Sequence, residues 1–142
     1  MRPTFRTFLL LACCAALWTA PATARAEPAI TVELNKLETV GKGCRVYMVF
    51  TNAATVALAS YKPDLVFFGK DGVIAERLVV EGGPLPAGKT KVKLFDIAEL
   101  GCGSIGRVLL NDIRACDGDA MAAGKCLAIT ATATRTKIEF VK

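Results

Sequence analysis

The segment from Gly83 to Thr90 has the letters of a nucleotide-binding loop. GPLPAGKT matches the pattern G-x-x-x-x-G-K-[ST], in which backbone N–H groups hold phosphate at the start of a helix. Pro84 and Pro86 each lack one of those N–H groups, and the following residues KVKLFDI alternate with the period of a strand. We therefore predict a proline-stiffened loop between two strands, with no nucleotide or other cofactor bound to it.

Four cysteines, Cys44, Cys102, Cys116 and Cys126, follow the N-terminal export segment described below. An even number in an exported chain favours two disulfide bonds. The chain has no histidine and no C-x-x-C pair, which argues against a zinc site and against thiol redox catalysis. If successive strands run up and down, the predicted pairs are Cys44–Cys102 at one end of the fold and Cys116–Cys126 at the other.

Few residues are suited to catalysis. Without histidine the chain lacks the usual base near neutral pH. The serines are Ser60 and Ser104, and the segment around Ser104 (GSIG) is one residue short of the G-x-S-x-G pattern of a nucleophile elbow. We expect no catalytic residue and a protein that is not an enzyme, although a pair of carboxylates that meets only in the fold stays open as an alternative.

A group of acidic residues could offer oxygen ligands to calcium: Asp112, Asp117 and Asp119. A calcium-binding loop of the EF-hand type needs more ligands and a terminal acidic residue at a fixed spacing, and these are missing here. We predict a solvated loop and no metal site.

Lys89, Lys91 and Lys93 alternate with apolar residues, so that Val92 and Leu94 face the opposite way. Such a lysine row has two interpretations. It could be an interaction face for acidic partners, or it could solvate one face of an edge strand and prevent edge-to-edge pairing. Of the two, we favour the solvated edge.

The segments that must position these residues have the patterns of strands separated by turns. Asp71-Gly72 predicts a hairpin with a type I′ turn, and Asp96 to Glu99 has the spacing of a helix capping box, with Gly101 as a left-handed stop. The expected strands are 30–34, 45–50, 65–68, 73–80, 90–95, 107–116 and a threonine-alternating strand or strand pair over 126–140, with a weaker candidate over 55–60.

About seven strands, spaced by turns and with almost no helical period, predict an all-β fold. An immunoglobulin-like β-sandwich of antiparallel strands, with one short helical turn and two disulfides, fits best. In Thr130, Thr132, Thr134 and Thr136 the alternation predicts a solvated face of the last strand. We assign residues 27–142 to this single domain.

Residues 1–26 have the pattern of a signal peptide. Arg2 and Arg6 precede the apolar run FLLLACCAALW, and a small-x-small motif ends at Ala26. The run is too short for a transmembrane helix, so we expect none in the mature chain. LLAC, ending at Cys13, resembles a lipobox and gives lipidation as the minor alternative. Cleavage would lower the net charge from +5 to +2, since three arginines leave, and we expect no nucleic-acid binding.

The stretch DLVFFGKDGVIAERLVVEGGPLPAGKTKVKLFDI, followed by GRVLLNDI and flanked by cysteines, resembles a family of small secreted proteins of alphaproteobacteria. Some members are labelled only by a twin-arginine export signal. Arg2 and Arg6 are not adjacent, which favours general export instead. The resemblance implies an envelope location and brings no activity or site residues with it.

We therefore expect a periplasmic or secreted binding module that recognises a protein or envelope component through a sheet face or edge. The alternatives are a structural or accessory subunit of an envelope complex and, less favoured, a small metal-dependent enzyme.

Overall fold

The computed structural model of the protein describes residues 28–118 and 125–142. The predicted signal peptide, with Cys13, and Asp119 lie outside these residues. Within them the elements are β1 (Ile30–Val40), β2 (Gly43–Asn52), β3 (Ser60–Gly69), β4 (Ile74–Val79), β5 (Thr90–Ile97), the 3-10 turn η1 (Cys102–Ser104), β6 (Ile105–Asp117), α1 (Cys126–Ile129), β7 (Thr130–Thr134) and β8 (Glu139–Val141).

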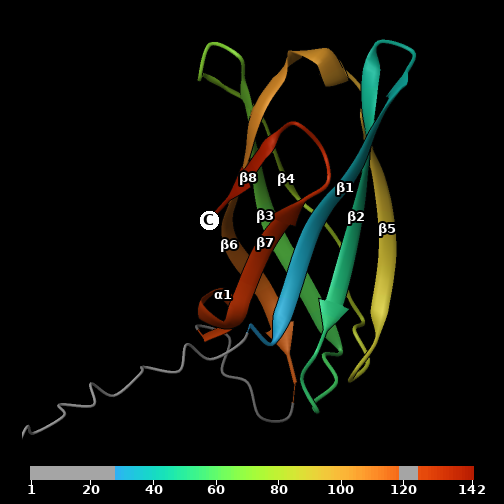
Figure 1. The fold of residues 1–142 in the computed structure, drawn as a ribbon, viewed down its shortest axis with the longest axis vertical. Coiled ribbons are helices and arrows are strands. Elements are labelled where there is room, and N and C mark those ends of the chain that lie inside the picture. Colours follow the sequence, from blue (N-terminus) through green and yellow to red (C-terminus); the bar gives the residue numbers. More distant parts are fainter. Residues whose placement is uncertain (1–27, 119–124) are drawn as a thin grey trace, which may run out of the picture.

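The strands form two facing sheets of four strands each within the described residues. The first sheet has the order β5-β2-β1-β7 and the second the order β4-β3-β6-β8 (Figure 1). The predicted all-β sandwich is confirmed, with eight described strands instead of about seven. No helix in the described part of the chain is long and apolar enough to cross a membrane.

The strands are not all antiparallel, which corrects one part of the prediction. β1 pairs with β7, and β6 with β8, in parallel. The cause lies in the C-terminal connections. After β6 the chain crosses from the second sheet to the first through α1, and β7 therefore enters beside β1 in the same direction.

The core lies between the sheets. In β2, which lies inside the first sheet, every second side chain is buried: Cys44, Val46, Met48 and Phe50. β3 is the corresponding inner strand of the second sheet and is buried on both faces from Pro63 to Phe67. The sequence does not mark this difference, because Val46 to Phe50 of β2 form as continuous an apolar run as Leu65 to Phe68 of β3.

Two disulfides have the predicted partners. Cys44 bonds to Cys102 with an S–S distance of 2.01 Å, and Cys116 bonds to Cys126. The first bridge joins the start of β2 to η1, just beyond the end of β5, and the second joins β6 to α1. The first bridge spans 58 residues of sequence and the second spans 10.

The hairpin between β3 and β4 is present, but its turn is not of type I′. A type I′ turn needs positive φ at both central residues, and here Gly72 has φ 80° whereas Asp71 does not have a positive φ. The Gly72 amide donates to the Gly69 carbonyl at 3.0 Å, and the Gly69 amide donates to the Val73 carbonyl at 2.8 Å. The Asp71 carboxylate also accepts from the Val73 amide at 3.1 Å, which stabilises this longer turn.

The helical turn predicted at Asp96 is wrong. β5 continues to Ile97, and Asp96 forms an ion pair with Arg45 on β2 instead of capping a helix. Gly101 has φ −64°, so it is not a left-handed stop, and the 3-10 turn η1 begins only at Cys102. The cross-strand ion pair wins over the local capping pattern because β2 already offers β5 a full ladder of partners.

The C-terminal and central predictions also need correction. Residues 55–59 form no strand, although Leu58 makes an isolated bridge to Leu85. Thr130 is buried, not solvated, because the chain turns inward through α1 just before it. Its hydroxyl oxygen lies 3.0 Å from the Tyr61 hydroxyl and donates to the Cys126 carbonyl at 2.7 Å.

Candidate functional site

β5 is an edge strand of the first sheet. Its one partner strand among the described residues is β2, along the whole length from Thr90 to Ile97. In Figure 1 it forms the outermost strand on one side of the sandwich. An edge strand leaves alternate backbone N–H and C=O groups without a sheet partner, so β5 presents a template for one more strand.

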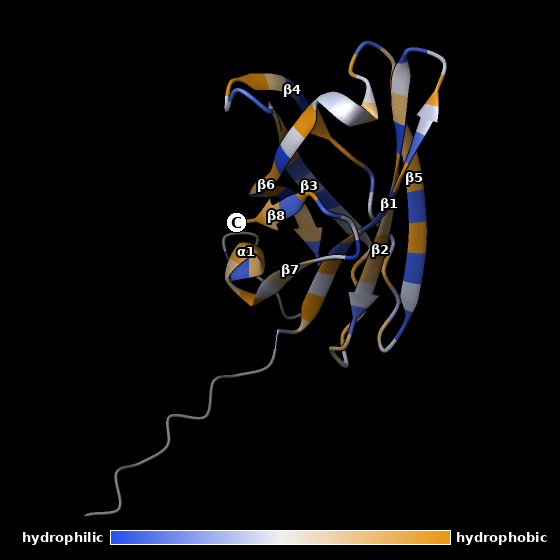
Figure 2. Cartoon of the chain, turned by 45° about the horizontal axis from the view of Figure 1, so that its top comes forward, coloured by the Kyte–Doolittle hydropathy of each residue, from blue (hydrophilic) through white to orange (hydrophobic). Residues whose placement is uncertain are grey.

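The orientation of β5 is the reverse of an ordinary amphipathic edge. Lys91 pairs with Phe50, and Lys93 pairs with Met48. Since directly opposite residues lie on the same face, the lysine side chains point to the core side of the sheet. Val92 and Leu94 point outward and are 62% and 56% exposed. Figure 2 shows the alternation of hydrophobic and hydrophilic residues along this strand.

Lys91 and Lys93 thus lie on the inner face of the edge strand, a choice that the alternating pattern alone does not fix. The reason lies at the other end of the strand. Ile97 is buried, and the Phe95 ring packs edge-on against Phe67 of the second sheet, with ring centroids 6.4 Å apart. Because side chains alternate strictly, anchoring these two residues inward turns Lys93 and Lys91 inward as well. Lys89 precedes the strand and is exposed.

A groove of about 350 Å³ separates the inner face of β5 from β4, the edge strand of the second sheet. Apolar side chains line much of it, and Lys93 lies among them. The lining of the groove includes Phe50, Leu78, Val80, Glu81, Lys93 and Phe95. The two sheets therefore do not close completely on this side, which gives Lys93 room to extend its ammonium group toward water.

The charges around this groove are unequally satisfied. Asp96 accepts two hydrogen bonds from Arg45, at 2.7 and 2.8 Å, and hydrogen bonding to Arg45 is the main cause of its lowered pKa. Glu81 pairs with Lys62 at 3.1 Å. By contrast, none of the three lysines of the row, Lys89, Lys91 and Lys93, forms an ion pair with another described residue. The carboxylates of Asp96 and Glu81 thus have ionic partners, whereas the three lysines of the row have none among the described residues.

A second charged group lies on the outer face of the second sheet. The Asp64 carboxylate is fully buried and accepts from Arg77 Nε at 3.0 Å, from Arg114 Nε at 3.0 Å and from Asn111 at 3.3 Å. Its hydrogen bonds to Arg77 are the largest cause that lowers the pKa of Asp64 to about 2. This cluster of charged residues was not predicted from the sequence. The one available signal was an acidic residue at the start of the apolar run DLVFF.

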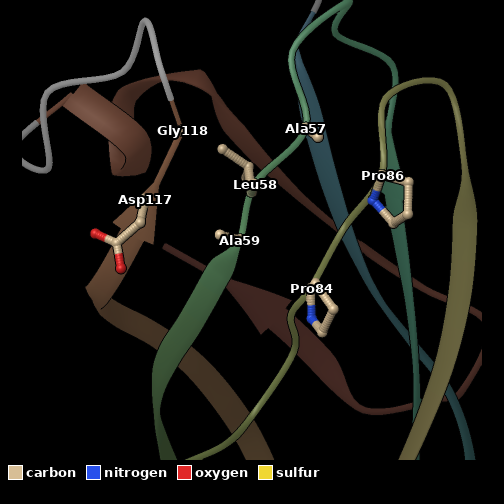
Figure 3. Close-up of a pocket in the computed structure, with 7 residues that line it drawn as sticks. All are labelled: Ala57, Leu58, Ala59, Pro84, Pro86, Asp117 and Gly118. Carbon is tan, nitrogen blue, oxygen red and sulfur yellow. The ribbon is translucent and has the colours of Figure 1, made fainter.

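The nucleotide-binding lookalike lies in a loop that leads directly into β5, where a phosphate loop would need a helix. The amide of Gly83 already donates to the Tyr61 carbonyl at 3.0 Å. A hollow of about 580 Å³ lies beside this loop, and Pro84, Pro86 and Asp117 line part of it (Figure 3). Asp117 is the one titratable side chain in its described lining, and Figure 3 shows its carboxylate pointing away from both prolines.

The remaining candidates do not assemble. No group of three or more acidic, cysteine or histidine side chains within the described residues could hold a metal ion. Asp112 accepts from the Ile113 amide at 2.8 Å and lies 3.6 Å from Arg114. Tyr61 is buried within the core, and its burial raises its pKa to about 12. Asp112 and Tyr61 thus make their contacts with other groups of the fold.

The geometry thus defines a disulfide-bonded β-sandwich with an open edge at β5. No family model matches the chain, and no curated protein sequence matches it. The solved structure of IrmA from Escherichia coli has a similar fold, with a TM-score of 0.55 over 72% of this chain and 89% of that chain. The two sequences are 10% identical, so the likeness concerns the fold alone.

Proposed function

We propose that this protein is an exported, non-enzymatic binding module that recognises a protein or envelope component through the edge strand β5. The observation that carries the proposal is β5 itself, an unpaired edge with Val92 and Leu94 exposed on one face. A contiguous exposed apolar patch with a polar rim marks an interaction site, and Val92 and Leu94 lie on neighbouring rungs of one face. The two disulfides fit an oxidising compartment, which supports export.

A binding role also suits the chemistry of the hollows. General acid–base catalysis needs at least one group with a suitable pKa next to the reacting atoms, and it commonly uses two groups. The described lining of the larger hollow offers Asp117 alone, and the groove beside β5 holds carboxylates that are already paired with Arg45 and Lys62. Recognition requires no such groups, since exposed backbone and apolar side chains are sufficient.

The test is capture from an envelope extract of the source organism with the tagged full-length protein. We expect a stoichiometric partner with the wild type and its loss with Leu94→Asp, which places a charge on the exposed face of β5. Val73→Asp is the matched control, because Val73 is 63% exposed but lies in the β3–β4 turn. Equal capture by all three proteins would overturn the proposal, and no capture by any of them, together with a metal ion in the purified protein, would favour the small metal-dependent enzyme.

A further inference from the structure

We infer that the natural ligand of β5 is an extended segment in which apolar and acidic residues alternate, and that it binds as an added strand. The inference rests on the proposed function and names the chemistry of the partner. A strand added beside β5 places its side chains directly next to those of β5 on each face, at about 5 Å between Cβ atoms.

The outer face selects apolar side chains. Val92 and Leu94 lie opposite Val49 and Tyr47 of β2, so two neighbouring rungs of the sheet are apolar. Polar pairs bound them at both ends. Arg45 and Asp96 form an ion pair at one end, and the hydroxyls of Thr51 and Thr90 lie 3.1 Å apart at the other. An added strand with two apolar residues, spaced two apart, would complete these rungs and cover the exposed surface.

The inner face selects acidic side chains. Lys91 and Lys93 lie opposite the fully buried Phe50 and Met48, and neither lysine has an ionic partner among the described residues. The intervening positions of an added strand would point to this same face. Carboxylates there would lie next to the two lysines, and the one beside Lys93 would lie at the groove that Leu78 also lines. Opposite charges at directly adjacent cross-strand positions stabilise the pairing.

The same lysines oppose a second copy of this chain as the occupant. Two β5 strands that pair antiparallel as one continuous sheet keep their outer faces together and their inner faces together. Lys91 and Lys93 would then lie beside the lysines of the other copy, and like charges directly opposite each other are unfavourable. Inward-pointing charges on an edge strand prevent self-association in this way. The lysines thus disfavour pairing with β5 of a second copy and favour pairing with a strand that carries acidic residues.

The experiment uses the exported, disulfide-bonded protein and three short synthetic peptides. One alternates valine and glutamate. The second has the same composition with its glutamates in one block, and the third replaces each glutamate of the first by lysine. Binding is measured by isothermal titration calorimetry, and protection of β5 amides by hydrogen exchange. We expect the alternating glutamate peptide to bind about tenfold more tightly than either of the others and to protect β5 amides.

A charge-reversed protein sharpens the test. Lys91→Glu combined with Lys93→Glu should invert the preference, so that the lysine peptide binds more tightly than the glutamate peptide. Circular dichroism and thermal unfolding show whether this variant is folded. If it is not, the comparison of the three peptides on the wild type still decides the question.

Four results would overturn the inference. Equal binding of the blocked and alternating peptides would show attraction by charge alone. Binding to vesicles of anionic phospholipid, with no binding of any peptide, would make a membrane surface the ligand. A dimer that protects β5 would make a second copy the occupant. If no peptide binds while Leu94→Asp still abolishes capture of a partner, this inference fails and the proposed function stands.

Discussion

Two charged regions of this sandwich differ in whether their charged side chains have ionic partners. Around Asp64, on the outer face of the second sheet, arginines and a carboxylate satisfy one another within 3.0 Å. Along β5, Lys91 and Lys93 point to the core side of the first sheet and have no ionic partner among the described residues.

The difference separates charges that hold the fold from charges that are available to a ligand. Burying the Asp64 carboxylate is tolerated because the chain itself supplies two guanidinium groups. The inward lysines of β5 are tolerated because both side chains remain partly exposed to water, and Lys93 also lines the groove. Removing Asp64 or its partners should therefore affect stability, whereas removing the lysines should affect binding.

The most severe way to disturb the lysine region is to cut the bridge beside it. Cys44→Ala with Cys102→Ala removes a crosslink across 58 residues, and we expect the free energy of unfolding to fall by about 4 kcal/mol. Cys116→Ala with Cys126→Ala removes one across 10 residues and should cost about 3 kcal/mol. Urea unfolding gives both values. Equal losses for the two pairs would contradict the dependence on loop length.

The next effect concerns the satisfied charges. Arg77→Ala with Arg114→Ala leaves the buried Asp64 carboxylate with Asn111 as its one described partner. We expect a loss of about 2 kcal/mol in the free energy of unfolding, because the carboxylate loses its charge-assisted hydrogen bonds to both guanidinium groups. Arg135→Ala is the control, since its side chain is 73% exposed and its pair with Glu33 should contribute less than about 1 kcal/mol. Similar losses in both proteins would remove the contrast between the regions.

Acid should weaken the same cluster. The pKa of Asp64 is about 2 in the folded protein, against 3.8 for an unperturbed aspartate. A carboxyl group with a depressed pKa contributes stability above the unfolded value, and this contribution is lost as the pH falls from about 3.8 toward 2. The stability difference between the wild type and Asp64→Asn should shrink over that interval, as followed by urea midpoints. A constant difference would show that Asp64 does not titrate as described.

The smallest effect on stability is expected at β5. Lys91→Gln with Lys93→Gln should change the free energy of unfolding by no more than about 0.5 kcal/mol, because no described ion pair is lost. The same variant should lose affinity for the alternating glutamate peptide. A large stability loss with unchanged affinity would mean that these lysines belong with the structural charges after all.

Much of the fold was predictable from local patterns. Period-two alternation and turn residues mark the strands, and both disulfide pairs follow from the count of strands and their alternating direction. The parallel neighbours of β7 and β8 did not follow, because they depend on a C-terminal crossover between sheets that no local pattern encodes.

The candidate site was only half predictable. The alternation of Lys91 and Lys93 with Val92 and Leu94 defines two faces but does not say which one points inward. That choice depends on the contact between Phe95 and Phe67, which joins two different sheets. The Asp64 cluster depends likewise on arginines from β4 and β6, and neither is near it in sequence.

The inward anchoring of Phe95 makes the recognition properties of this edge sensitive to chain length. Deleting one residue between that anchor and Lys91 would exchange the two rows of side chains in the N-terminal half of β5. A valine side chain would then point into the groove and a lysine side chain would point outward to solvent. β5 would become an edge strand with its apolar face inward and its polar face outward. The loss of a single codon in frame would thus remove the proposed binding by β5 while the sandwich still folds.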